Sequence, residues 1–212
     1  MGTVSDLVVE LDGLSYVWTG SRWYRQRDFI TPPMATIQRL QALLPDDTSA
    51  AQTSAEQLIE CPRSLRATWP DPLATDWLAR YPQLFDADDY RCTRKQPELH
   101  FWEWFAAIHV YERDGACSLV EKYVYKNHPV KTARLASFLS DEQRETFAAI
   151  LRRHHVEPPD LFVYVPQTGR FWFAEVKGPT DRLRAKQAAS HQDIERELGA
   201  PVEILRFTLT ED

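Results

Sequence analysis

The chain has 212 residues with a formal net charge of −6, and 43% of its residues are hydrophobic and 12% aromatic. This composition is typical of a folded globular protein and excludes an intrinsically disordered chain. No run approaches the roughly 18 apolar residues of a membrane-spanning helix, so we expect a soluble, cytoplasmic protein without membrane contact. The negative charge disfavours non-specific attraction to polyanions, so any nucleic-acid contact must come from a local basic patch.

The first part of the chain predicts a small aromatic hairpin followed by a short helix. Ser15–Trp18 and Arg22–Tyr24 flank a turn that contains Gly20, which indicates two paired strands. A stripe of apolar residues then favours a helix, and its members are Ile37, Leu40 and Leu44. This unit is too small to bury a core alone, so we expect it to dock on the main body or on a partner.

A domain boundary is predicted after this unit. Residues 46–54 are small and polar without periodicity, which is the composition of a linker. The stretch from Cys61 to Pro97 holds several prolines and predicts short helices and irregular loops. We therefore predict an N-terminal appendage over residues 1–95 and a main domain over residues 96–212.

The main domain opens with a helical pattern from Glu98 to Arg113, and Asp114-Gly115 is a stop signal. The apolar stripe of this helix consists of Leu99, Trp102, Ala106 and Val110. Glu103 falls on the same stripe. Because a carboxylate on a buried face needs a partner or a function, Glu103 is a candidate functional residue.

The next segment predicts one strand and two helices. Ser118 to Lys126 alternates in hydrophobicity as a strand does, and Lys131 to Leu139 then reads as a helix. A second helix is predicted from Asp141 to His155, opened by Ser140 and Gln143 in the spacing of a capping box.

A β-hairpin follows. Pro158–Val165 and Phe171–Pro179 are rich in aromatic and β-branched residues and are separated by Pro166–Gly169. If those four residues form the loop, Val165 pairs with Arg170. Counting outward then places Asp160 opposite Glu175, with their side chains within about 4.5–5.5 Å at Cβ.

Two carboxylates side by side repel each other unless a positive group lies between them. Period-two alternation places Lys177 on the same face as Glu175. Two carboxylates and a lysine at one strand end suit a hard divalent cation such as Mg²⁺, which takes oxygen ligands and keeps waters for a phosphate substrate. The chemistry that this pattern favours is metal-assisted hydrolysis of a phosphodiester.

A final helix and strand complete the predicted domain. Thr180 or Asp181 is predicted to cap a helix that runs to Leu198 and stops at Gly199, and Val202–Thr208 reads as a strand. The inward stripe of the helix consists of Leu183, Gln187, Ile194 and Leu198. The polar Gln187 therefore lies one turn from the helix start, within reach of the strand end. Positive charge gathers on the adjoining face, and the predicted DNA-backbone contacts are Arg182, Arg184 and Lys186.

These residues carry a resemblance to a known family. Asp160 followed by Glu175-Val176-Lys177 resembles the signature of the PD-(D/E)XK nucleases, and the longer string from Glu175 to Gln187 resembles the VRR-NUC branch. The resemblance implies an α/β fold with a restriction-endonuclease-like αβββαβ core. The predicted elements agree with that order, with a helical insertion before Asp160.

The resemblance also implies the roles of the site residues. Asp160, Glu175, the Val176 carbonyl and an acidic residue of the preceding helix would bind Mg²⁺ or Mn²⁺, and Glu103 best resembles that acid. Lys177 would orient the water and stabilise the transition state, and Gln187 would position the phosphate. The acids that remain as alternatives to Glu103 are Glu98, Glu112 and Glu121.

The implied activity is that of a DNA nuclease acting on branched or structured DNA. Other members of the family resemble dimeric junction resolvases, so a homodimer and a repair or phage role are expected alternatives. Some resemble antibacterial toxins of type VI secretion that an immunity protein neutralises, and the small size and aromatic appendage favour this setting. An inactive member that only holds DNA or a protein is the rival from another class.

Overall fold

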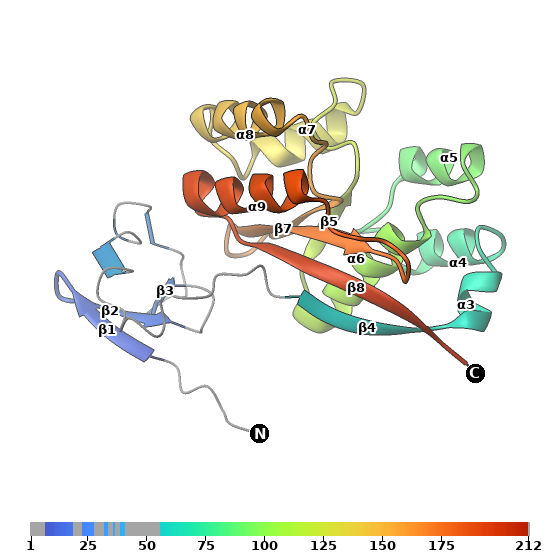
Figure 1. The fold of residues 1–212 in the computed structure, drawn as a ribbon, viewed down its shortest axis with the longest axis horizontal. Coiled ribbons are helices and arrows are strands. Elements are labelled where there is room, and N and C mark those ends of the chain that lie inside the picture. Colours follow the sequence, from blue (N-terminus) through green and yellow to red (C-terminus); the bar gives the residue numbers. More distant parts are fainter. Residues whose placement is uncertain are drawn as a thin grey trace.

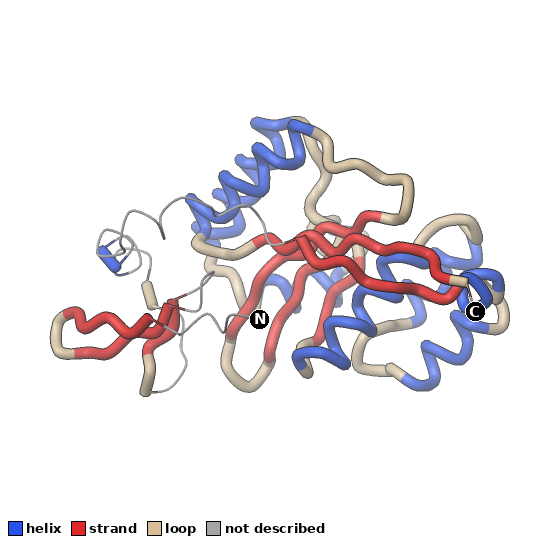
Figure 2. The backbone as a smooth tube through the Cα atoms, turned by 60° about the horizontal axis from the view of Figure 1, so that its bottom comes forward, coloured by secondary structure: helices blue, strands red, loops and turns tan. Residues whose placement is uncertain are grey.

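The structure, a computed structural model, describes residues 7–18, 23–27, 32–33, 36, 39–40 and 56–211. Its main body is a five-stranded sheet with the strand order β4-β8-β7-β6-β5. The strands are β4 (Glu56–Pro62), β5 (Cys117–Val120), β6 (Leu161–Val165), β7 (Arg170–Lys177) and β8 (Val202–Thr210). The strands β5, β6 and β7 are antiparallel neighbours, whereas β8 runs parallel to both β7 and β4. Figure 2 shows the strands of this sheet side by side, with helices around them.

Helices lie on both faces of this sheet (Figure 1). They are α3 (Arg63–Ala67), α4 (Leu73–Arg80), α5 (Ala87–Lys95), α6 (Phe101–Asp114), α7 (Pro129–Ala136), α8 (Asp141–His154) and α9 (Ala185–Leu198). The order α6-β5-β6-β7-α9-β8, with α7 and α8 inserted after β5, confirms the predicted α/β core and its helical insertion. None of the helices in the described ranges combines the length and apolarity that crossing a bilayer requires.

Strand β7 divides the hydrophobic core into two parts. Trp172, Ala174 and Val176 belong to a cluster that includes buried residues of α4 and α6. Phe173 faces the opposite way, into a cluster with Phe147 of α8 and other residues of α7 to α9. Because alternate residues of one strand enter both clusters, β7 is buried on both faces and forms the centre of the three-layer arrangement.

The hairpin has the predicted register. Val165 pairs with Arg170 and Leu161 with Ala174, so Asp160 comes next to the level of Glu175. The turn closes through hydrogen bonds from the Thr168 and Gly169 amides to the Val165 carbonyl. Gly169 has φ +69°, a left-handed conformation that favours glycine and that a side chain would strain.

The strand predicted from Ser118 to Lys126 ends sooner, at Val120. Glu121 and Lys122 have φ of 44° and 52°, and residues in this left-handed conformation cannot continue a strand. The segment instead turns, with the Tyr125 amide donating to the Lys122 carbonyl at 3.2 Å.

Helix α9 begins at Ala185 rather than after Thr180 or Asp181. Asp181 is used in a tight turn, where its carboxylate accepts a hydrogen bond from the Gly178 amide at 3.0 Å. The first turn of α9 is completed by Gln187, whose side-chain oxygen accepts from the Arg184 amide at 3.1 Å. The predicted helix end at Gly199 and the predicted capping box of α8 are both confirmed.

The N-terminal residues form a three-stranded antiparallel sheet of β1 (Leu7–Leu11), β2 (Leu14–Trp18) and β3 (Trp23–Arg25). The pair β2–β3 is the predicted hairpin, and β1 was not predicted. Of the predicted helix, Ile37 and Leu44 lie outside the described residues, as does the linker at 46–54.

Strand β4 was not predicted from the sequence. It pairs in parallel with β8, and Ile59 of β4 and Trp77 of α4 share the core that contains α6. Residues 56–95, which the sequence assigned to the appendage, thus contribute to the main sheet and its core. The boundary at residue 95 stays a prediction about folding units.

Helices α8 and α9 are joined by an ionic network centred on Asp193, which is 8% exposed. The Asp193 carboxylate lies 2.8 Å from His154 Nε2 and accepts a hydrogen bond from Arg153 at 2.7 Å; it also pairs with Arg196. The hydrogen bonds from His154 and the two arginines lower the pKa of Asp193 to about 2. This network joins α9, which carries Gln187, to α8.

We predict that Asp193→Asn destabilises the protein at pH 7 by about 1–2 kcal/mol, a value reduced because the two arginines are partly exposed. A lowered carboxyl pKa stabilises the folded state above the ordinary pKa, near 3.8, and this contribution disappears as the pH falls toward 2. Urea unfolding of both proteins between pH 7 and pH 2 measures the difference, which should shrink at the acid end. A difference that is constant with pH would contradict an ionic role for Asp193.

Candidate active site

Asp160 lies at the start of β6 and is fixed by its backbone and its side chain. Its carbonyl accepts a hydrogen bond from the Glu121 amide at 2.8 Å, which joins the end of β5 to β6. Its Oδ2 accepts one from the Val176 amide, also at 2.8 Å. The Asp160 carboxylate is therefore held against β7 at the level of Glu175, as the register predicted.

Glu175 is the most tightly held of the predicted site residues. Lys177 Nζ and Gln187 Nε2 each donate to Glu175 Oε1 at 2.6 Å, and His191 Nε2 lies 3.4 Å from Oε2. Burial alone would raise the pKa of Glu175, which is 3% exposed, but His191 and Lys177 outweigh it and the pKa lies below its ordinary value. Glu175 is therefore a charged carboxylate whose orientation is fixed from two elements.

Asp160 and Glu103 have the opposite electrostatic balance. Burial and then the charges of Glu175 and Glu103 raise the pKa of Asp160 well above its ordinary value, although Lys177 opposes them. Burial and the charge of Glu121 raise the pKa of Glu103 to about 7. The site thus holds more negative charge than Lys177 compensates.

A divalent cation fits this donor set. Mg²⁺ and Mn²⁺ prefer oxygen ligands, and a cation beside these carboxylates would offset both the burial and the repulsion that raise the pKa values of Asp160 and Glu103. The Val176 carbonyl, predicted as a further ligand, belongs to the β7 residue between Glu175 and Lys177. The carboxylates of Asp160 and Glu175, which lie at one level of the hairpin, are oxygen donors of the kind that such a cation takes.

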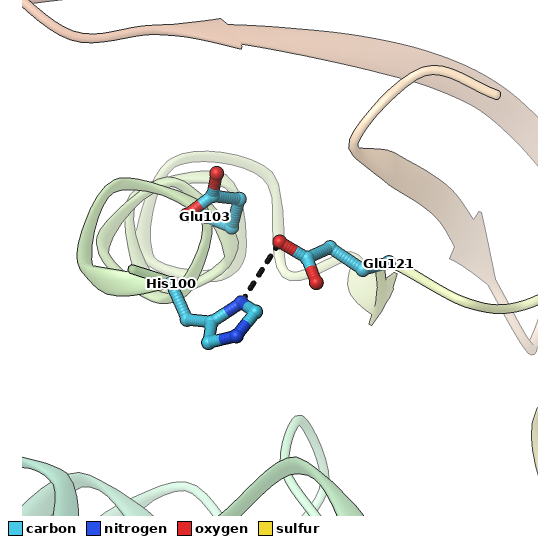
Figure 3. A group of neighbouring side chains, drawn as sticks. All are labelled: His100, Glu103 and Glu121. Carbon is cyan, nitrogen blue, oxygen red and sulfur yellow. Dashed lines mark hydrogen bonds and ion pairs between the residues drawn. The ribbon is translucent and has the colours of Figure 1, made fainter. Parts of the chain in front are cut away.

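In the described part of the chain, a group of potential ligand atoms comes from His100, Glu103 and Glu121 (Figure 3). One ligand atom from each of His100, Glu103 and Glu121 lies within 4.8 Å of the others. His100 Nδ1 is 2.9 Å from Glu121 Oε1, and its Nε2 is 3.1 Å from the side-chain oxygen of Gln96. The sequence treated Glu103 and Glu121 as alternatives, whereas the structure brings the two acids together.

The remaining alternatives lie elsewhere. Glu112 accepts a hydrogen bond from the Tyr81 hydroxyl at 2.5 Å, and Glu98 is exposed before the start of α6. His100 and Glu121 are among the non-glycine residues with a positive φ, of 71° and 44°. Such conformations cost about 1–3 kcal/mol each and are common at functional sites.

Gly178 permits the close contact that positions α6 at this site. A Cβ at this position would lie 2.9 Å from Nε1 of Trp102 and 3.1 Å from the Asp181 carboxylate. Trp102 also stacks on Phe207 with ring centroids 5.3 Å apart. Because Trp102 precedes Glu103 in the chain, the glycine allows α6 to bring Glu103 to the end of β7.

The predicted DNA contacts surround the start of α9. Arg182, Arg184 and Lys186 are all exposed, with Arg184 directly before the helix and Lys186 in its first turn. All three residues lie between the end of β7 and Gln187 in the chain.

Two residues of this site were not found from the sequence. His191 is 2% exposed and follows Gln187 by four residues, so both lie on the face of α9 that contacts Glu175. That spacing was the available signal. His100 directly precedes α6 and has a left-handed backbone conformation. No periodic pattern in the sequence indicates such a residue.

The fold and the site define an α/β protein of the restriction-endonuclease-like class, with acidic residues and a lysine at the ends of neighbouring strands. Residues 109–208 match the family model of the VRR-NUC domain. Residues 109–208 therefore form a VRR-NUC domain. Glu103 and His100 precede the matched region.

A comparison with solved structures finds the crystal structure of paFAN1 bound to a 2-nt 5′ flap DNA with a gap. The similarity covers 84% of this chain and 41% of the paFAN1 chain, with 17% sequence identity and a TM-score of 0.32. The chain thus spans less than half the length of that protein. No curated protein matches the sequence.

We predict that Mn²⁺ binds at this site and raises the melting temperature of the protein, because a ligand at about 100 times its Kd stabilises the folded state by about 2.7 kcal/mol. Asp160→Asn should lose this shift. Its metal-free form should melt at the same temperature or higher, since the variant removes a buried charge but keeps an acceptor for the Val176 amide. Thermal unfolding across a Mn²⁺ titration measures both effects.

The same titration tests His191. His191→Ala should weaken Mn²⁺ binding about tenfold or more, which is usual when a group that orients a metal ligand is removed. His191→Gln keeps a donor for Glu175 and should retain most of the affinity. Lys95→Met, at the exposed end of α5, is the control. Equal Mn²⁺ affinity in the alanine variant and the wild type would show that His191 does not orient Glu175.

Proposed function

We propose that this chain is a divalent-metal-dependent deoxyribonuclease that hydrolyses phosphodiester bonds. The observation that supports it most strongly is that Asp160 and Glu175 lie at the same level of the hairpin, with Lys177 beside them, inside a VRR-NUC domain. Because these carboxylates repel each other in a buried position, the site is preorganised for a cation rather than stable without one.

Asp160, Glu175, Glu103 and the Val176 carbonyl would hold Mg²⁺ or Mn²⁺. When bound, the ion would polarise a phosphoryl oxygen and lower the pKa of a water molecule. His100 and Glu121 would support Glu103, since ligand atoms of all three residues lie within 4.8 Å of one another. Gln187 donates a hydrogen bond to Glu175, so we propose that it orients this carboxylate and does not contact the phosphate directly.

Lys177 would assist the reaction directly. Its ammonium is 8% exposed and donates one hydrogen bond to Glu175 Oε1, while an ammonium has three donors. The other donors can orient the attacking water and stabilise the negative charge that develops on the phosphoryl oxygens. Glu175 keeps the lysine at the strand end, so the charge is in place before substrate binds.

DNA would be held through its backbone by Arg182, Arg184 and Lys186. These residues supply the local positive charge that a protein with a net charge of −6 needs for nucleic-acid binding. Contacts of this kind set position and not sequence, which is consistent with the branched or structured DNA that we propose as substrate.

We predict that Lys177→Met lowers kcat by about a hundredfold or more, because it removes a donor at the developing charge. Glu175→Gln should abolish cleavage, because a neutral amide is a weak ligand for Mg²⁺. Cleavage of labelled flap and duplex DNA measures both, with circular dichroism to confirm folding. Lys95→Met serves as the matched control, since it removes the charge of an exposed lysine that is not one of the proposed site residues.

EDTA should stop cleavage, and added Mg²⁺ or Mn²⁺ should restore it. Cleavage that persists in EDTA, or in the Glu175→Gln variant, would refute the proposed site. Metal-stimulated binding of DNA without cleavage by the wild type would favour the rival function, an inactive member of the fold that only holds DNA.

The biological setting stays a prediction from the sequence. It comprises an antibacterial role with a cognate immunity protein, and a repair or phage role with a homodimer as the alternative. Growth arrest on expression, relieved by a neighbouring gene product, is the expected sign of the first.

A further inference from the structure

A cavity of about 450 Å³ opens beside Asp160. One wall is the turn after β5 and the other is the segment before β6, and the lining residues are Glu121, Lys122, Tyr125, Asn127, His128 and residues 157–160. This volume lies within the roughly 300–1,000 Å³ of pockets that hold a single small ligand. The cavity therefore has room for one group of that size next to the proposed metal site.

The two walls are fixed to each other. The Glu121 amide donates to the Asp160 carbonyl at 2.8 Å, and the fully buried Tyr123 donates its hydroxyl proton to the Pro159 carbonyl at 2.6 Å. Within the turn, the His128 amide donates to the Tyr125 carbonyl at 2.9 Å. The cavity is thus formed before any ligand enters, which lowers the entropic cost of binding.

An aromatic ring stands at the cavity wall away from Asp160. Tyr125 is 40% exposed, and its hydroxyl donates to the Glu157 carboxylate. This hydrogen bond is the main cause that raises the pKa of Tyr125 to about 12, so the ring is neutral. A ring that is anchored at its hydroxyl and exposed on the cavity is a platform on which a planar group can stack.

Charged side chains are among the residues that line the cavity. Asp160 and Glu121 lie together at the end that adjoins the proposed metal site, and Glu157 is engaged by Tyr125. Lys122 supplies a positive charge to the lining, and its Nζ contacts the Cys92 sulfur at 3.2 Å. Acidic groups next to the proposed metal site, a lysine and an aromatic platform match the phosphate, the sugar–phosphate backbone and the base of a nucleotide.

We propose that this cavity holds one unpaired nucleotide of the substrate, next to the scissile phosphate, with its base stacked on Tyr125. The inference rests on the proposed nuclease function for the position of the phosphate. Since a paired base would have to leave its duplex to enter, and unpairing costs free energy, the cavity favours flaps, bulges and single-stranded ends.

Equilibrium binding of a short fluorescent oligothymidylate to the full chain tests this proposal, with Ca²⁺ as the metal and a gel to show that the oligonucleotide stays intact. Tyr125→Leu should weaken binding about tenfold or more, the usual effect of losing one stacked base. Tyr125→Phe keeps the ring but loses the hydrogen bond to Glu157, so it should bind more tightly than Tyr125→Leu and retain most of the wild-type affinity. Binding of a blunt duplex should change little in either variant.

Cleavage of a flap substrate provides the matched test on the DNA side. An abasic site at the nucleotide next to the cut should lower wild-type cleavage to the level of Tyr125→Leu, and it should not lower cleavage by that variant further. Non-additive losses of this kind identify a direct contact between the base and the ring.

The outcomes separate this inference from the proposed function. If the wild type cleaves DNA and Tyr125→Leu binds and cleaves equally well, the nucleotide site is wrong and the nuclease function stands. If the wild type cleaves nothing but binds oligothymidylate through Tyr125, the nucleotide site stands and the nuclease function is wrong. Tighter binding of the blunt duplex than of the oligothymidylate would also overturn the proposal.

Discussion

The repulsion among buried carboxylates at the end of β6 and β7 is the constraint on which the rest of the structure depends. Asp160 and Glu175 lie at the same level of the hairpin, and Glu103 approaches from α6. Burial, and after it the neighbouring negative charges, raise the pKa values of Asp160 and Glu103, so the charged forms of these acids need surrounding elements that hold them in place.

The elements that hold the site come from both faces of the sheet. From one face, α9 supplies Gln187 and His191, which fix the two oxygens of Glu175. From the other core layer, α6 supplies Glu103, and the absence of a side chain at Gly178 lets Trp102 approach β7. The turn after β5 then adds Glu121 and closes one wall of the cavity beside Asp160. The proposed metal site and the cavity therefore adjoin each other at Asp160.

The sequence predicted the hairpin register because local rules determine it: the turn residues define the loop, and period-two alternation assigns the faces. It missed β4, since this strand pairs with β8, and the two are separated by most of the chain. It extended β5 to Lys126 because hydrophobic alternation continues there, although the left-handed residues Glu121 and Lys122 end the strand. These residues depart from the local pattern at the place where the site is formed.

The sequence by itself determined the αβββαβ order, the pairing of Asp160 with Glu175 and the position of Lys177 beside them, because each follows from the spacing of residues along one hairpin or helix. Only the tertiary structure decided which further side chains reach these carboxylates. The site also receives side chains from separate elements, namely His100, Glu121 and His191. Gln187 donates a hydrogen bond to Glu175. Their positions depend on how α6, α9 and the turn after β5 pack around the sheet, and such long-range packing leaves no periodic mark in the sequence.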